Sequence, residues 1–93
     1  MNTEQIIRMS DLQNLIPRKA QIQFRRKKGQ VGAYLEIEVT IKPPLTHEEH
    51  NEMVEKIITF YGEDLIEVYT EETGHWFYVY LRMSATQPTT VEV

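Results

Sequence analysis

The sequence predicts a small α+β domain in which two β-hairpins form a four-stranded antiparallel sheet with one helix packed on a face. Residues 31–41 alternate between apolar and polar or small side chains, and residues 64–83 show a similar alternation around a central Thr-Gly pair. Between these segments, residues 47–61 carry apolar side chains at helical spacing. With a short N-terminal helix the expected order is α-ββ-α-ββ, and the 93-residue chain is expected to form a single domain over residues 1–83.

The N-terminal segment predicts a helix within residues 4–16, and its start can be placed in two ways. Thr3 could cap a helix that runs to Ile16, or Ser10 could cap a shorter one through the capping-box pattern Ser-Asp-Leu-Gln. Pro17 ends either version, because the residue before proline disfavours the helical region. Residues 10–16 are therefore helical in both interpretations.

Residues 18–42 predict the first hairpin, with apolar side chains that alternate through both strands. A two-residue turn at Lys28-Gly29 would supply the positive φ that a tight turn needs. This turn would place Phe24 opposite Ala33. It would also form two further apolar pairs, Ile22 with Leu35 and Ala20 with Ile37. A slip by one residue would place apolar side chains opposite polar ones, so the alternation restricts the register.

The segment 47–61 predicts a helix with clear ends. Pro43-Pro44 stops the preceding strand, because proline cannot donate to a sheet ladder. Thr46 and Glu49 form a second capping-box pattern, and Gly62 suits the position that ends a helix. The apolar stripe of this helix consists of Met53, Val54, Ile57, Ile58 and Tyr61.

Residues 64–83 predict the second hairpin, with its turn at Thr73-Gly74. One face would then hold the pairs Val68–Val79, Ile66–Leu81 and Thr70–Phe77, and the other Tyr69–Tyr78, Glu67–Tyr80 and Glu71–Trp76. The following residues, 84–93, are rich in threonine and lack an apolar period, which predicts a mobile C-terminal tail.

Composition and charge narrow the functional classes. The absence of cysteine excludes a disulfide scaffold, a thiolate metal site and a cysteine nucleophile. No apolar run approaches the ~18 residues of a membrane helix, and no secretory signal is visible, so we expect a cytoplasmic protein without membrane contact. The net charge of −4 is divided, because residues 1–42 hold eight Lys and Arg against four Asp and Glu, whereas residues 43–93 hold two against ten.

The sheet face opposite the helix carries the main functional prediction. Alternation places five aromatic residues on it, namely Tyr34, Tyr69, Trp76, Tyr78 and Tyr80. Monomeric proteins rarely leave large apolar patches open to water, so something should cover this face. We expect a small non-enzymatic interaction module that self-associates, as a dimer, or docks a protein partner. A polar rim of Arg25, Glu36, Glu38 and Arg82 would fix the register of that contact.

Nucleic-acid binding is the alternative function. Arg25, Arg26, Lys27 and Lys28 are four adjacent cations at the predicted hairpin tip, where they could contact phosphates, and the aromatic face could stack on bases. Glutamates on that same face and the overall acidic charge oppose this interpretation.

Catalytic and metal signals are weak. His47 and His50 lie three residues apart in the first helical turn, which is not the spacing of zinc-protease helices. The acidic run of Glu48, Glu49, Glu52 and Glu55 is typical of a solvated helix face. We therefore expect no metal, no cofactor and no enzymatic activity.

Overall fold

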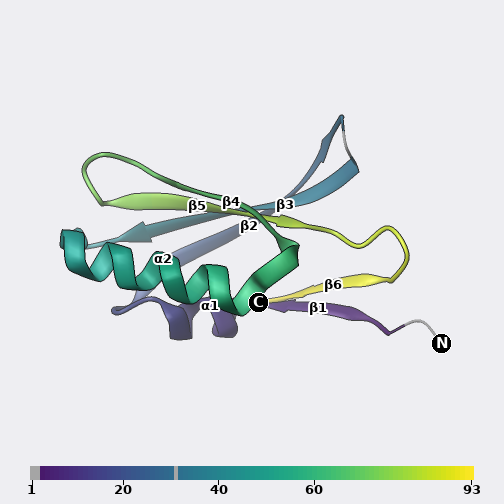
Figure 1. Ribbon diagram of the computed structural model, residues 1–93, viewed down its shortest axis with the longest axis horizontal. Helices are drawn as coiled ribbons and strands as arrows, with labels where there is room; N and C mark the ends of the chain where they lie inside the picture. Colours follow the sequence, from purple (N-terminus) through teal and green to yellow (C-terminus); the bar gives the residue numbers. More distant parts are fainter. Residues whose placement is uncertain (1–2, 31) are drawn as a thin grey trace.

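The computed structural model describes residues 3–30 and 32–93 and has the predicted α+β architecture with two additional strands (Figure 1). The elements in order are β1 (Gln5–Arg8), α1 (Met9–Leu15), β2 (Ala20–Gly29), β3 (Gly32–Ile41), α2 (His47–Tyr61), the 3-10 turn η1 (Gly62–Asp64), β4 (Leu65–Thr70), β5 (Trp76–Arg82) and β6 (Thr89–Glu92). The main sheet has the order β2-β3-β5-β4, and all of its neighbours are antiparallel. A second, parallel sheet pairs β1 with β6.

The core lies between the main sheet and the two helices. The inner face of the sheet contributes seven buried side chains, Leu35, Ile37, Val39, Ile41, Phe77, Val79 and Leu81. Leu12 of α1 and Met53 and Ile57 of α2 close the core from the other side. Both helices lie on this side of the sheet (Figure 1). The N-terminal helix therefore packs beside α2 and does not cover the aromatic face.

The first hairpin keeps the predicted faces, but the predicted register is wrong. Phe24 pairs with Ile37 in place of Ala33, and every β2 residue is displaced by the same four positions along β3. The strands end at Gly29 and Gly32, so the turn lies beyond Lys28-Gly29, and Gly32 takes the positive φ of 115°. The alternation of apolar and polar residues excludes a displacement by an odd number of positions, because that would exchange the two faces of the strand. It does not exclude a displacement by an even number such as four. Val31, which the alternation placed on the inner face, lies outside the described residues.

The second hairpin has the predicted register except at its start. Val68 pairs with Val79 and Tyr69 with Tyr78, as predicted. At the beginning of β4 the register shifts, because Leu65 and not Ile66 lies opposite Leu81. Ile66 is thus the extra residue of a β-bulge, and 45% of it is exposed. The predicted pairing of Ile66 with Leu81 is therefore wrong, because Leu65 occupies the core position.

Helix α2 begins and ends where the sequence predicts. The hydroxyl of Thr46 accepts the backbone N–H of Glu49, and the carboxylate of Glu49 accepts the backbone N–H of Thr46. Gly62 follows the helix with a positive φ of 54°. In contrast, α1 begins at Met9 without a side-chain cap, so neither Thr3 nor Ser10 caps it, and residues 5–8 form β1.

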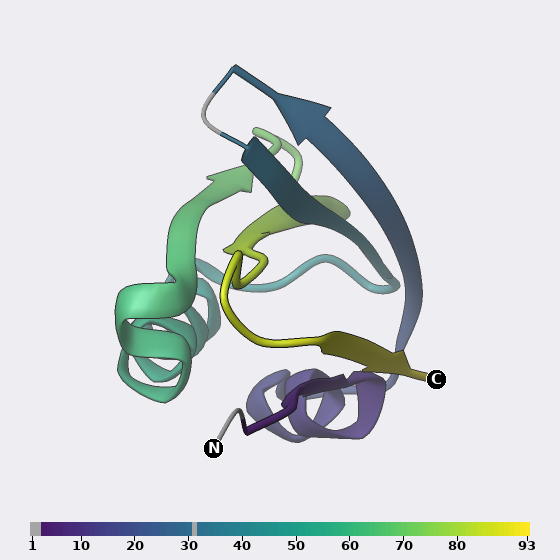
Figure 2. The same ribbon diagram turned by 90° about the vertical axis from the view of Figure 1, so that its right-hand side faces the viewer.

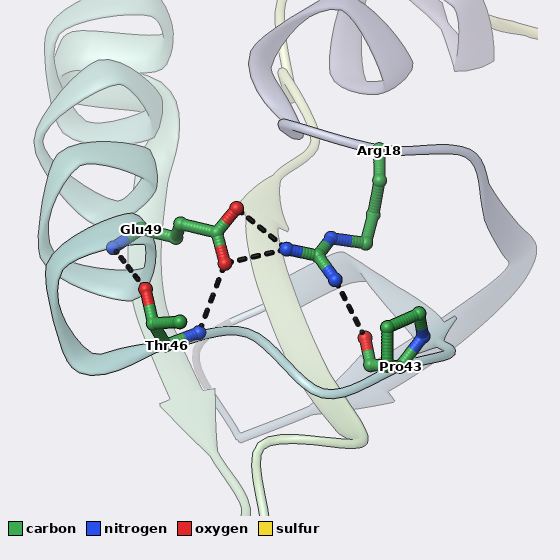
Figure 3. Close-up of polar contacts among 4 residues, drawn as sticks. All are labelled: Arg18, Pro43, Thr46 and Glu49. Carbon is green, nitrogen blue, oxygen red and sulfur yellow. Dashed lines mark hydrogen bonds and ion pairs between the residues drawn. The ribbon is translucent and has the colours of Figure 1, made fainter.

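An ion pair ties the connection between α1 and β2 to the start of α2 (Figure 3). The Nη2 atom of Arg18 contacts both carboxylate oxygens of Glu49, at 2.5 Å each, and Nη1 donates to the carbonyl of Pro43. The backbone N–H of Thr46 and the Arg18 guanidinium together lower the pKa of Glu49 below its ordinary value. The same carboxylate therefore serves the helix cap and the link between the helices.

The segment predicted as a mobile tail, 84–93, contains β6. Thr89 pairs with Gln5 and Val91 with Ile7, so the two ends of the chain form one parallel ribbon (Figure 2). Val91 packs against the core, and the side-chain oxygen of Gln5 accepts the N–H of Ser84 and the hydroxyl of Thr89. The sequence analysis did not predict β6, because its partner strand β1 lies at the opposite end of the chain.

Candidate functional site: the outer face of the sheet

The outer face, defined here as the face of the main sheet turned away from α1 and α2, gathers all five predicted aromatic residues. Tyr34 comes from β3, Trp76, Tyr78 and Tyr80 from β5, and Tyr69 from β4. Their inward-pointing neighbours on β3 and β5 are buried, which confirms the alternation on these strands. The sheet thus brings together residues that are 46 positions apart in the sequence, from Tyr34 to Tyr80.

Four of these side chains form a continuous tyrosine ladder across three strands. The ring centroids of Tyr34 and Tyr80 lie 6.2 Å apart, those of Tyr80 and Tyr78 also 6.2 Å, and those of Tyr78 and Tyr69 6.4 Å. Tyr78 and Tyr80 are stacked with an angle of 18° between their planes. Such contacts hold the rings in place and leave each hydroxyl free to bond elsewhere.

The tyrosine ladder is only partly buried. Tyr69 is 55% exposed and Trp76 40% exposed, while Tyr34, Tyr78 and Tyr80 are intermediate. The bulge in β4 adds Ile66 to this surface, beside a groove of about 290 Å³ lined by Gly32, Ala33, Tyr34, Ile66 and Arg82. The adjacent apolar residues Leu65 and Ile66 interrupt the alternation in the sequence, and this was the signal for the bulge.

Arg25 is engaged by carboxylates on the outer face. Its Nη1 atom lies 2.7 Å from Glu38 and 3.4 Å from Glu36, and the hydrogen bond to Glu38 is the main cause of its raised pKa. The predicted cluster of four cations at the hairpin tip is therefore divided. Arg25 forms ion pairs within the sheet, whereas the other three cations, Arg26, Lys27 and Lys28, are exposed.

Tyr80 lies between two glutamates. It pairs with Glu36 on one side and with Glu67 on the other. Partial burial is the main cause of its raised pKa, and the negative charge of Glu36 adds to it. The phenol therefore stays protonated over the physiological range and can donate a hydrogen bond.

The end of the β2–β3 hairpin, called here the projecting arm, comprises residues 26–29 together with 32 and 33, and its tip extends past the rest of the sheet. Tyr34 is the last β3 residue in register with β5, where it lies opposite Arg82. Beyond it, Lys28 pairs with Ala33 and only two strands continue. The arm bends away from the helices and rises above the outer face (Figure 1).

The histidines do not form a common site. His50 Nε2 lies 2.6 Å from the hydroxyl of Thr70, whereas His47 is exposed at the start of α2 and His75 precedes β5. Within residues 3–30 and 32–93, no group of three or more His, Asp or Glu side chains is placed to hold a metal ion. In the same part of the chain, no helix has the length and apolar character needed to span a membrane.

No family model matches this chain, and neither a curated protein nor a solved structure matches it significantly. Fold analogy therefore adds nothing to the functional argument. The chemistry and geometry of the outer face remain as its basis.

Proposed function

We propose that this protein is a small non-enzymatic binding module that contacts another protein through the outer face of its sheet. The observation that carries the proposal is the tyrosine ladder, extended by Trp76 and Ile66, on a face that neither helix covers. Apolar surface of this kind is typical of interaction sites. Tyrosine and tryptophan suit such sites because they combine a large apolar ring with a polar group.

The charge of the outer face supports a protein partner over a nucleic acid. Three cations and three carboxylates lie on it, namely Arg25, Lys27, Arg82, Glu36, Glu38 and Glu67. A phosphate backbone requires a positive surface, because neutralising phosphates and releasing their counterions supplies the binding energy. A balanced face with aromatic side chains at its centre matches a protein surface instead.

Site-specific photo-crosslinking in cells tests the proposal. A benzoyl-phenylalanine at position 69 would lie on the outer face, and the same residue at position 60 would lie on α2, in the helix layer on the other side of the sheet. Tyr69 and Phe60 are closely matched, with exposed fractions of 55% and 52%. We expect a discrete protein adduct at position 69 and none at position 60. Adducts at both positions or at neither would refute the proposal, as would an adduct to nucleic acid only.

A second candidate, binding of single-stranded nucleic acid, rests on the projecting arm with its three exposed cations. If all three contact phosphates, raising the salt from about 50 to about 200 mM should weaken binding about 20-fold, from a slope of about −0.7 per contact. Fluorescence anisotropy with a labelled oligothymidine, for the wild type and the Lys27→Ala, Lys28→Ala variant, checks this. Weak binding that neither salt nor the substitutions change would rule this candidate out.

A further inference from the structure

We infer that the partner of the outer face is a second copy of this chain, related to the first by a twofold axis parallel to the strands. This inference rests on the proposed function, because it identifies the protein that occupies the same face. Its basis is the distribution of charge across the sheet and the symmetry that this distribution allows.

The two edge strands of the sheet carry opposite charge on the outer face. On β2, Arg25 and Lys27 point outward, and the projecting arm continues this basic edge. On β4, Glu67 points outward beside Tyr80, and the acidic turn η1, with Glu63 and Asp64, leads into the strand. Because β2 and β4 lie at opposite ends of the order β2-β3-β5-β4, the face has a basic side and an acidic side.

Only one face-to-face arrangement makes these sides complementary. A twofold axis perpendicular to the strands, within the plane of the contact, would place each β2 over β2 of the partner subunit and bring like charges together. An axis parallel to the strands exchanges the two sides, so that each β2 lies over β4 of the partner subunit. A closed dimer uses the same patch on both copies, so the second axis brings the oppositely charged edge strands together twice.

The central strands also become complementary about this axis. Strand β3 then lies over β5 of the partner subunit, and residues at the same level along the strands meet. Glu36 faces Tyr80 of the partner subunit, whose phenol can donate to the carboxylate. Tyr34 faces Arg82 of the partner subunit, an arrangement suited to a cation–π contact. The aromatic band thus acquires polar partners that a flat apolar surface would not give it.

The area of the face indicates how tight this dimer is. Four strands about 4.8 Å apart and about seven residues long, at about 3.4 Å each, give a face of roughly 450 Å². Two copies would bury roughly 900 Å², which is near the lower limit for a specific interface, and the projecting arm adds to it. We therefore expect a weak, reversible dimer.

Sedimentation equilibrium of the full chain over a range of concentrations tests the inference. We expect the mass to rise from 11.0 kDa towards twice that value. Arg25→Glu and Glu67→Lys should each raise the dissociation constant about 10-fold or more. Arg25 lies at the same level along the strands as Glu67 of the partner subunit, so each change places like charges opposite each other in the dimer. The double variant restores opposite charges across the axis, and its dissociation constant should return to within about threefold of the wild type.

Matched aromatic variants separate this inference from the proposed function. Tyr69→Ala should weaken the dimer, whereas Phe60→Ala, on the helix layer, should leave it unchanged. A dimer that the charge exchange fails to restore would overturn the proposed symmetry. A strict monomer whose position 69 crosslinks to a different protein would overturn self-association and leave the proposed function standing. A strict monomer without any protein adduct at position 69 would overturn both.

Discussion

Val91 and Val93 lie two residues apart at the end of the chain but in different environments, and this contrast tests the attachment of β6. Val91 pairs with the buried Ile7 and packs against the core, whereas Val93 is 98% exposed. Truncating a fully buried valine to alanine removes two carbon groups at about 0.8 kcal/mol each. Because Val91 is only partly buried, we expect Val91→Ala to lower the free energy of unfolding by about 1 kcal/mol. Val93→Ala should change it by less than about 0.5 kcal/mol.

Thermal unfolding, followed by circular dichroism, measures this difference directly. For a domain of this size, about 1 kcal/mol corresponds to a Tm lowered by about 4–8 °C. Ending the chain after Pro88 removes β6 altogether and exposes Ile7, so the loss should reach about 3 kcal/mol. If both valine variants and the truncated chain melt with the wild type, residues 84–93 behave as the mobile tail that the sequence suggests, and the argument for β6 is refuted.

Four further substitutions test the fold elsewhere. Thr46→Ala removes one half of the capping box and should cost about 1 kcal/mol in urea denaturation; an unchanged midpoint would show that the cap does not stabilise α2. Glu49→Gln should destabilise the protein at pH 7, and its difference in stability from the wild type should close below pH 4.5. The pKa of Glu49 is lower in the folded protein than its ordinary value of 4.5, so its carboxylate stabilises the folded protein above pH 4.5, and this contribution is lost as the pH falls through the folded-state pKa. A difference in stability that persists in acid would contradict this reasoning. Ile37→Ala empties a fully buried position and should cost about 2–5 kcal/mol by the same assay, so a loss below about 1 kcal/mol would mean that the core is not packed as described. Tyr61→Phe should leave stability unchanged or raise it slightly, because burial, with a smaller effect of Asp11, raises the pKa of this phenol to about 12 and its hydroxyl has no hydrogen-bond partner among the described residues; a large loss would reveal one.

The elements with strong local signals were predictable from the sequence. Helix α2 runs over the predicted residues because Thr46, Glu49 and Gly62 fix its ends through contacts within a few positions. The alternation of β3 and β5 placed the aromatic residues on the outer face for a similarly local reason, since successive side chains of a strand point to opposite sides. The tyrosine ladder was therefore foreseeable as a set of residues on one face.

Other features of the candidate site depend on neighbours that the sequence does not reveal. The contact of Arg25 with Glu38 required the register of the first hairpin, which is displaced by four positions from the prediction. The outward position of Ile66 required the bulge at the start of β4. The basic and acidic sides of the face required the strand order, because only that order sets β2 and β4 at opposite edges.

The amino-acid sequence by itself determined which side of each strand faces the core, where α2 begins and ends, and which aromatic residues share a face. These properties repeat every two or 3.6 residues and are fixed by steric rules that act within a few positions. The tertiary structure alone decided the strand order, the register of the first hairpin and the pairing of Gln5 with Thr89. Such contacts are selected by the free energy of packing the whole core, which no local pattern of residues encodes.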